Sequence, residues 1–198
     1  KNAGYRAVVL KSQNQGTADR VPFIRMVVPD IDVFGSITLN YSVGGINPFA
    51  VNAALGFGAK IVWMPTIDAR NHMNYFGGLG QFGSSIKAEK KLPDFYQKAK
   101  GLTVLADDGT LLPEVRDILD LVAASRTALG LGHLNLKEMM ALVKGCQEAG
   151  VKKMFIDHPD LAFTKVPLEA QVEFAKMGVK LNYVAAELSP RFHCITPK

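Results

Sequence analysis

The sequence has few cysteines, no long apolar run and no large excess of charge, and each shortage excludes a class of protein. Its two cysteines, Cys146 and Cys194, are too far apart for a disulfide framework or a zinc motif. They fit free thiols in a reducing cytoplasm. No apolar stretch approaches the roughly 20 residues that a membrane-spanning helix needs. Residues 1–5 also lack the apolar core of a signal peptide, so we expect a cytoplasmic protein with no membrane association.

The charge pattern and the lack of two motifs argue against three functions: nucleic-acid binding, serine-hydrolase activity and dinucleotide binding. The net charge is +5, and the lysines form short groups without interleaved aromatic residues, which is typical of solvated surface and predicts no nucleic-acid binding. A G-x-S-x-G motif does not occur, so serine-hydrolase chemistry has no support. The letters G-x-G-x-x-G occur at 78–83 but do not directly follow a strand, so we interpret them as a loop.

What the sequence does contain is an alternation of buried strands and amphipathic helices. The expected strands are short and almost continuously apolar, as in a parallel sheet that is covered on both faces. They are residues 5–12, 32–40, 59–66, 127–133, 152–159 and 179–187. The expected helices begin at an Asn cap or a proline and end near glycine. They are residues 48–56, 113–125, 136–150 and 167–178.

This alternation fits a doubly wound sheet or a (β/α)₈ barrel of the TIM type. We favour the barrel because polar residues follow nearly every strand, where barrels build their active sites. The chain holds about six of the eight βα units. We therefore expect residues 1–198 to be a single, incomplete barrel domain that lacks a strand at each end.

The spacing between strands more than doubles after the strand at 59–66. The extra residues, 67–112, form an insertion that contains a hairpin turn at Asp108-Gly109. An insertion after a barrel strand lies over the catalytic rim, so we predict a lid or pocket wall. A surface excursion or a subunit contact, and hence a homo-oligomer, is an equally open interpretation.

Two histidines end consecutive strands at the same register. His133 and His158 should therefore meet at one mouth of the barrel, where two neutral imidazoles commonly begin a divalent metal site, most often zinc. The plainer alternative is a pair of hydrogen-bonded rim histidines. Asp157 should face the other way on a regular strand and orient a catalytic group. His72, in the insertion, is a candidate general acid or base.

Three polar residues at strand ends are candidates for substrate contact. Lys11 lies at the end of the first strand and could hold a carboxylate, although a lysine in that place is often simply solvated. Asn40 and Thr66 end the next two strands. Together they predict a small, anionic substrate. His193, near the end of the chain, has nothing in the sequence to position it.

Five short segments of the sequence, in their order and spacing, resemble an uncharacterised family of amidohydrolase-like proteins, the DUF6282 type. The segments are "GYRAVVLKS", "NYSVGGINPFAV", "GAKIVWMPT", "LGHL" and "DHP". The resemblance covers essentially all of the chain and implies a metal-dependent hydrolase on a (β/α)₈ barrel. It also implies that His133 and His158 match the metal histidines of the fifth and sixth strands.

The sequence departs from that pattern in ways that affect the metal. Gln13 stands where relatives often carry a histidine, and Thr66 and Asp68 stand where binuclear members have a bridging lysine or glutamate. These differences favour a mononuclear site or one that has lost its metal. We therefore expect a hydrolase of a C–N or C–O bond, with a metal-free barrel that binds a ligand or serves assembly as the alternative.

Overall fold

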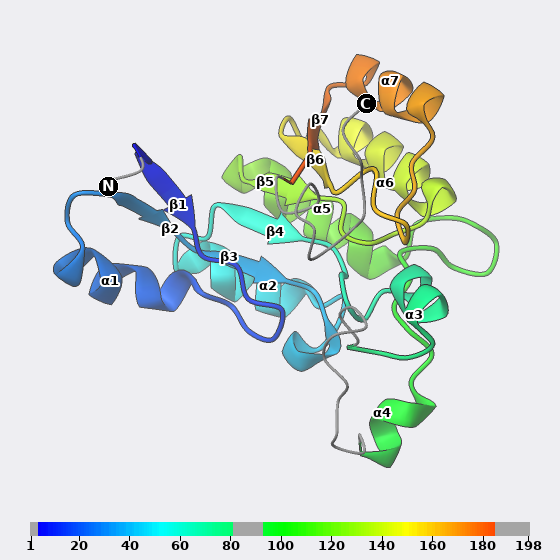
Figure 1. Ribbon diagram of the computed structural model, residues 1–198, viewed down its shortest axis with the longest axis horizontal. Helices are drawn as coiled ribbons and strands as arrows, with labels where there is room; N and C mark the ends of the chain where they lie inside the picture. Colours follow the sequence, from blue (N-terminus) through cyan, green and yellow to red (C-terminus); the bar gives the residue numbers. More distant parts are fainter. Residues whose placement is uncertain (1–3, 81–92, 185–198) are drawn as a thin grey trace.

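The computed structural model describes residues 4–80 and 93–184 of the chain. The described strands are all parallel and lie in two sheets (Figure 1). The first sheet pairs β1 (Ala7–Val9) with β2 (Asp32–Phe34). The second sheet has five strands that follow one another in chain order. They are β3 (Ser36–Thr38), β4 (Ile61–Trp63), β5 (Ala128–Gly130), β6 (Met154–Asp157) and β7 (Val179–Asn182).

The predicted α/β class with a parallel sheet is confirmed, and the strands are shorter than predicted. The expected strand at 32–40 is split into β2 and β3 at Gly35. A Cβ atom at Gly35 would lie 2.2 Å from the Cα atom of Ala18, so only glycine lets the two backbones approach. Within the described residues the strands do not close into a barrel, and the prediction of a complete (β/α)₈ architecture is not confirmed.

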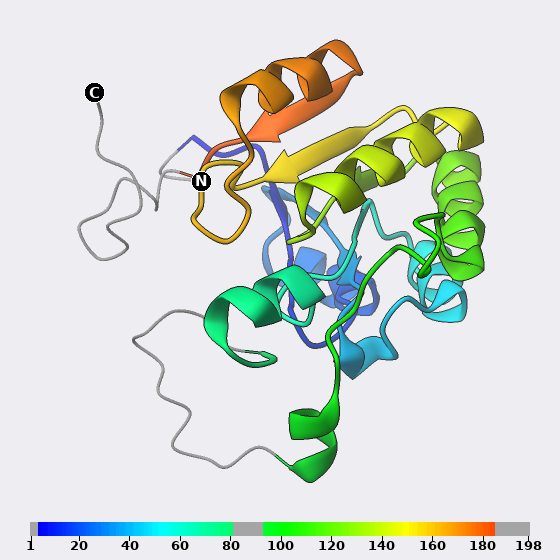
Figure 2. The same ribbon diagram turned by 90° about the vertical axis from the view of Figure 1, so that its right-hand side faces the viewer.

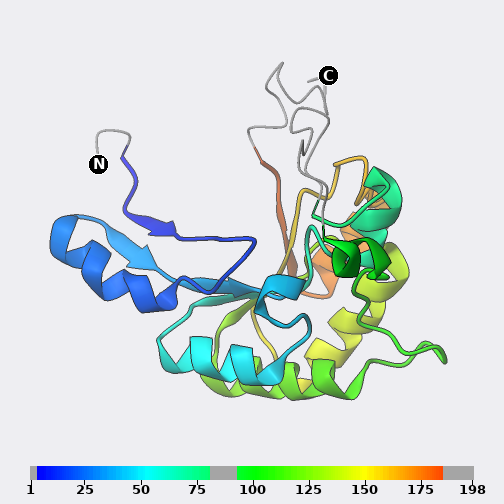
Figure 3. The same cartoon turned by 90° about the horizontal axis from the view of Figure 1, so that it is seen from below.

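Helices cover one face of the larger sheet. Figure 3 shows α2 (Pro48–Gly56), α5 (Pro113–Ser125) and α6 (Leu136–Ala149) side by side beneath the strands, and these helices contact one another in that order. Helix α7 (Leu168–Lys176) packs on β7. The buried core lies between this layer and the sheet, because the apolar stripes of α5 and α6 face the strands.

The helix boundaries follow the predicted caps. The side chain of Asn47 accepts hydrogen bonds from the first turn of α2, and Pro48 occupies its first position. Asn135 and Glu138 form the predicted capping box at the start of α6, with reciprocal bonds of 3.0 and 3.1 Å. Gly150, in the left-handed conformation, ends that helix.

The remaining short elements lie at the two ends of the sheet. Near the first sheet are η1 (Ala18–Arg20) and α1 (Val21–Val27), and η2 (Tyr41–Val43) follows β3. The insertion contributes α3 (Arg70–Phe76) and α4 (Asp94–Lys98). Seen from the side in Figure 2, α3 and α4 lie on the opposite side of the strands from α5.

The predicted hairpin turn in the insertion is present. Leu105 and Leu111 form an antiparallel bridge around Asp108-Gly109. Residues 81–92 of the insertion, and with them part of the G-x-G-x-x-G sequence, lie outside the described residues, as does His193. The single-domain boundary and the role of the insertion as a lid stay predictions.

Candidate functional site

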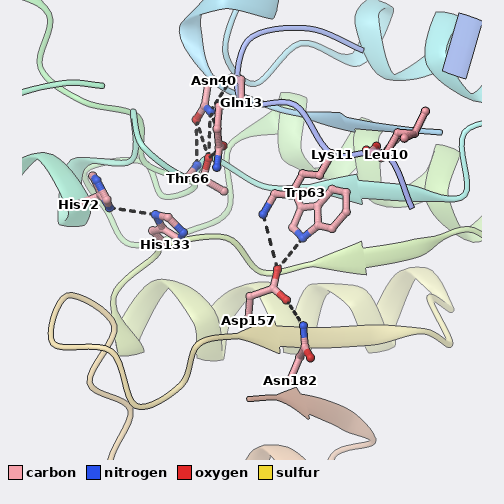
Figure 4. A network of polar contacts seen from close by, with 11 residues as sticks. Leu10, Lys11, Gln13, Asn40, Trp63, Thr66, His72, His133, Asp157 and Asn182 are labelled. Atoms are coloured by element: carbon pink, nitrogen blue, oxygen red, sulfur yellow. Dashed lines mark hydrogen bonds and ion pairs between the residues drawn. The ribbon is translucent and has the colours of Figure 1, made fainter. Parts of the chain in front are cut away.

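The carboxyl-terminal ends of the parallel strands bring the predicted site residues together (Figure 4). Lys11 follows β1, Asn40 follows β3, Thr66 follows β4, and His133 follows β5. Asp157 ends β6. Parallel strands place these ends at one edge of the sheet, which is the usual position of a site in α/β proteins.

A pair of buried imidazoles forms one part of this edge. The Nδ1 atoms of His72 and His133 are 2.9 Å apart, and the two rings stack with a centroid distance of 4.8 Å. Their side chains are 0% and 1% exposed. One nitrogen must donate and the other accept, so at least one ring carries a proton on Nδ1. His72 comes from α3 of the insertion, so the insertion does reach the site.

His158 is the third imidazole of the cluster. Its ring centroid is 5.8 Å from that of His133, in an edge-to-face arrangement. The sequence predicted that His133 and His158 would lie close together, and they do. It did not predict that His72 would be nearer to His133 than His158 is, because His72 lies on a helix and not at a strand end.

Burial favours the neutral form of His133 and His158. It lowers the pKa of His133 well below its usual value, and the proximity of His72 and Lys11 lowers it further. Burial also lowers the pKa of His158, while the negative charge of Asp157 opposes that shift. Neutral imidazoles accept protons and bind metals, so both proposed uses remain chemically available.

A network around Asp157 forms the second part of the edge. The Oδ2 atom of Asp157 accepts a 2.6 Å hydrogen bond from Trp63 Nε1, and its Oδ1 atom accepts one of 2.6 Å from Asn182 Nδ2. The Nζ atom of Lys11 lies 3.8 Å from Oδ2 and 4.5 Å above the centre of the Trp63 ring. Burial lowers the pKa of Lys11, and Asp157 opposes this shift.

Gly130 makes the contact between Trp63 and Asp157 possible. Trp63 is on β4 and Asp157 is on β6, so the indole must cross β5. It does so over Gly130, where a Cβ atom would lie 2.4 Å from the ring. The sequence did not reveal this approach, because a glycine in a strand has several possible explanations.

The expected orientation of Asp157 differs from the observed one. We predicted that Asp157 and His158 would point to opposite sides of a regular strand. The strand ends at Asp157, and His158 has a φ of 51°, in the left-handed region. The alternation therefore stops at His158, and both side chains belong to the same edge of the sheet.

Gln13, Asn40 and Thr66 form a third group at this edge. The hydroxyl of Thr66 donates to Gln13 Oε1 at 2.5 Å, and Asn40 Nδ2 donates to Thr66 Oγ1 at 2.9 Å. The backbone N–H of Thr66 donates to Asn40 Oδ1. Asn40 and Thr66 are fully buried and are hydrogen-bonded to one another. Their contacts are those of a structural network that fixes the loops around the site.

An aromatic side chain covers the imidazoles. Phe163, in the loop between β6 and α7, has its ring centroid 4.6 Å from that of His133 and 4.9 Å from that of His72. Asn71 on α3 holds the loop, since its Nδ2 atom donates to the carbonyls of Phe163 at 2.7 Å and His133 at 3.2 Å. Neither Phe163 nor Asn71 carries a sequence signal that would have identified it.

The fit of a metal ion can be tested on these residues. The donor type is suitable, because imidazole nitrogens bind zinc and burial lowers the pKa of His133 and His158. In residues 4–80 and 93–184, however, no three His, Cys, Asp or Glu side chains converge closely enough to hold one ion. The described residues thus fall short of a catalytic zinc set, which has three protein ligands. No chemical step is therefore derived through a metal.

Fold and site together define the class of this protein, a parallel α/β protein with a buried polar site at the carboxyl-terminal edge of its sheet. The chain belongs to the family of unknown function DUF6282, whose model matches residues 1–182. A search of the curated proteins finds no match. Among the described residues, no helix is both long and apolar enough to cross a membrane. The absence of nucleic-acid binding, the cytoplasmic location and a homo-oligomeric state stay predictions.

Proposed function

We propose that this protein is a metal-dependent hydrolase of the amidohydrolase type, built on a (β/α)₈-like barrel and acting on a C–N or C–O bond of a small anionic substrate. The observation that supports it best is the proximity of His133 and His158, whose ring centroids are 5.8 Å apart at the ends of neighbouring strands. Imidazoles gathered at the carboxyl-terminal edge of a parallel sheet are the usual start of such a site.

The proposed metal is zinc, with His133 and His158 as ligands and His72 as their neighbour. When bound, zinc would polarise the scissile carbonyl and lower the pKa of a bound water to about 7. The ligand set needs at least one more donor than the described residues bring together. The proposal therefore depends directly on whether the purified protein holds metal.

The remaining residues have proposed roles that need no metal. Lys11 would bind the anionic group of the substrate, since its side chain is partly exposed at the edge of the sheet. Asp157 would position Lys11, because Trp63 and Asn182 fix both of its oxygens. His72 would transfer a proton, provided that its hydrogen bond to His133 opens in the substrate complex.

Metal analysis of the full chain tests this proposal. We expect stoichiometric zinc in the purified protein, and its loss in His133→Ala and His158→Ala, measured by elemental mass spectrometry after dialysis. Glu148→Gln, which removes an exposed carboxylate on α6, is the control and should keep the metal. A metal-free parent after growth and purification with added zinc would contradict the proposal.

The second candidate is a metal-free barrel that binds a ligand or serves assembly. It is favoured by the hydrogen bond between His72 and His133, which uses the lone pair of one Nδ1 atom. It is also favoured by the lack of three converging ligands in the described residues. On this interpretation, alanine variants of the histidines would change stability and leave the metal content at background.

A further inference from the structure

Access to the imidazoles is a problem that any chemistry at this site must solve. His72 and His133 are 0% and 1% exposed, so neither a substrate nor an ion reaches them in the conformation observed. Two hollows on the described surface, one between α5 and α6 and one beside α2, do not include them. Entry therefore requires that a covering group moves.

Phe163 is the covering group that contacts every member of the cluster. Its ring centroid lies 4.6 Å from that of His133, 4.9 Å from that of His72 and 6.4 Å from that of His158. It also packs against Phe76 on α3, at 5.7 Å. The ring is itself partly exposed, so it lies between the buried imidazoles and the solvent.

The loop that presents Phe163 has internal hydrogen bonds, and Gln171 of α7 donates to its Asp160 side chain and Val166 carbonyl. Its own hydrogen bonds close it on itself: Val166 N donates to Pro159 O at 2.8 Å, and the hydroxyl of Thr164 donates to the carbonyl of His158. These bonds can persist when the loop shifts. The tie across to α3 is different, because there Asn71 Nδ2 donates to Phe163 O at 2.7 Å.

The ends of the loop have unusual backbone conformations. His158 and Lys165 have φ angles of 51° and 36°, a region that non-glycine residues seldom occupy. Such positions concentrate at segments that change conformation. They flank the stretch that carries Phe163.

We infer that Phe163 is the gate of this site and that Asn71 is its latch. Opening releases the bond from Asn71 to the Phe163 carbonyl and moves the ring away from His72 and His133. Phe163 is thus an access-determining residue, and not a catalytic one. The inference rests on the proposed function only for what enters, because the gate would serve a metal, a substrate or another ligand.

Chemical modification of the histidines tests the gate without a substrate or a metal. The protein is first treated with a chelator to remove any metal and is then exposed to diethylpyrocarbonate. The rate of modification of each histidine is measured by peptide mass spectrometry. We expect Phe163→Ala to raise the rates at His72 and His133 about tenfold or more, because local opening controls access to buried groups. Asn71→Ala should raise both rates by a smaller factor, and Phe163→Tyr should keep the parent rate.

The control is Phe57→Ala, which removes an exposed phenyl ring from a position beside α2, away from the histidines. Its labelling rates should equal those of the parent. Parent rates at His72 and His133 in folded Phe163→Ala and Asn71→Ala would overturn the gate. So would an equal rise in the rate at which iodoacetamide modifies the buried thiol of Cys146, because that would indicate loosening of the whole domain. A metal-free parent would end the metal proposal and leave this result unaffected.

Discussion

The two halves of the site hold their polar groups in opposite ways. In the imidazole half, His72 and His133 are buried and share a hydrogen bond between their Nδ1 atoms, and burial lowers the pKa of His133. In the charged half, Asp157 lies beside Lys11, whose side chain is 27% exposed. Asp157 also accepts hydrogen bonds from Trp63 and Asn182. A buried polar group needs hydrogen-bond partners, and the two halves supply them differently: ring to ring in one, and from Trp63 and Asn182 in the other.

The two halves also differ in how firmly the fold holds them. The charged half is fixed by strands, because Trp63, Asp157 and Asn182 all lie in the five-stranded sheet. The imidazole half depends on a helix of the insertion and on the loop that carries Phe163. We therefore expect substitutions in the charged half to change stability, and substitutions around the imidazole half to change access to the histidines.

Removing the carboxylate of Asp157 is the strongest test of the charged half. Asp157→Ala leaves the N–H groups of Trp63 and Asn182 without their acceptor and Lys11 without its counter-charge. We expect the free energy of unfolding to fall by about 3 kcal/mol, measured by urea denaturation. Asp157→Asn retains the size of the side chain and one carbonyl acceptor, so it should cost about 1 kcal/mol. Equal losses in the two variants would contradict this account.

The neutral state of His133 predicts how stability depends on pH. Its pKa is lower in the folded protein than the usual 6.5, so the unfolded chain binds the extra proton first. Stability from this group is complete above about pH 6.5 and is lost as the pH falls toward the folded value. The slope should approach about 1.4 kcal/mol per pH unit.

His133→Gln removes the titrating ring and should make that slope smaller. The measurement is urea denaturation of the parent and the variant at pH 7.5, 6.5 and 5.5, with metal chelated. Phe57→Ala serves as the control, because it removes an exposed ring beside α2 and keeps both the histidines and Lys11. An unchanged slope in His133→Gln would show that His133 is not the group that responds.

Replacing Lys11 should have the smallest effect on stability. Its ion pair with Asp157 is long, at 3.8 Å, and the side chain is partly exposed, so solvent screens much of the attraction. The apolar stem of Met can still lie over Trp63. We expect Lys11→Met to change the free energy of unfolding by less than about 1 kcal/mol. A loss as large as that of Asp157→Ala would show that the pair acts as a buried unit.

Much of the local structure could be predicted because it depends on neighbouring residues. The Asn135–Glu138 capping box, the start of α2 at Pro48 and the turn at Asp108-Gly109 each arise from short-range hydrogen bonds or fixed backbone angles. The strand ends were also recognisable, since polar residues interrupt apolar runs there. They predicted that His133 and Asp157 would share one edge of the sheet.

The predictions that differ from the structure concern features that depend on the tertiary structure. Gly35 divides a predicted strand because Ala18 passes close to it, and no pattern around Gly35 indicates that neighbour. The alternation that should have turned Asp157 away ends at His158 because the backbone there enters the left-handed region. A period of two applies only while the strand is regular.

The sequence by itself determined the parallel α/β class, the caps of the main helices and the set of polar residues at the strand ends. These follow from local periodicity and from backbone preferences. Only the tertiary structure decided that His72 would be hydrogen-bonded to His133, that Trp63 would cross Gly130 to reach Asp157, and that Phe163 would cover the imidazoles. Side-chain contacts over 60 or more positions depend on how whole elements pack, and the residues near each partner carry no trace of that packing.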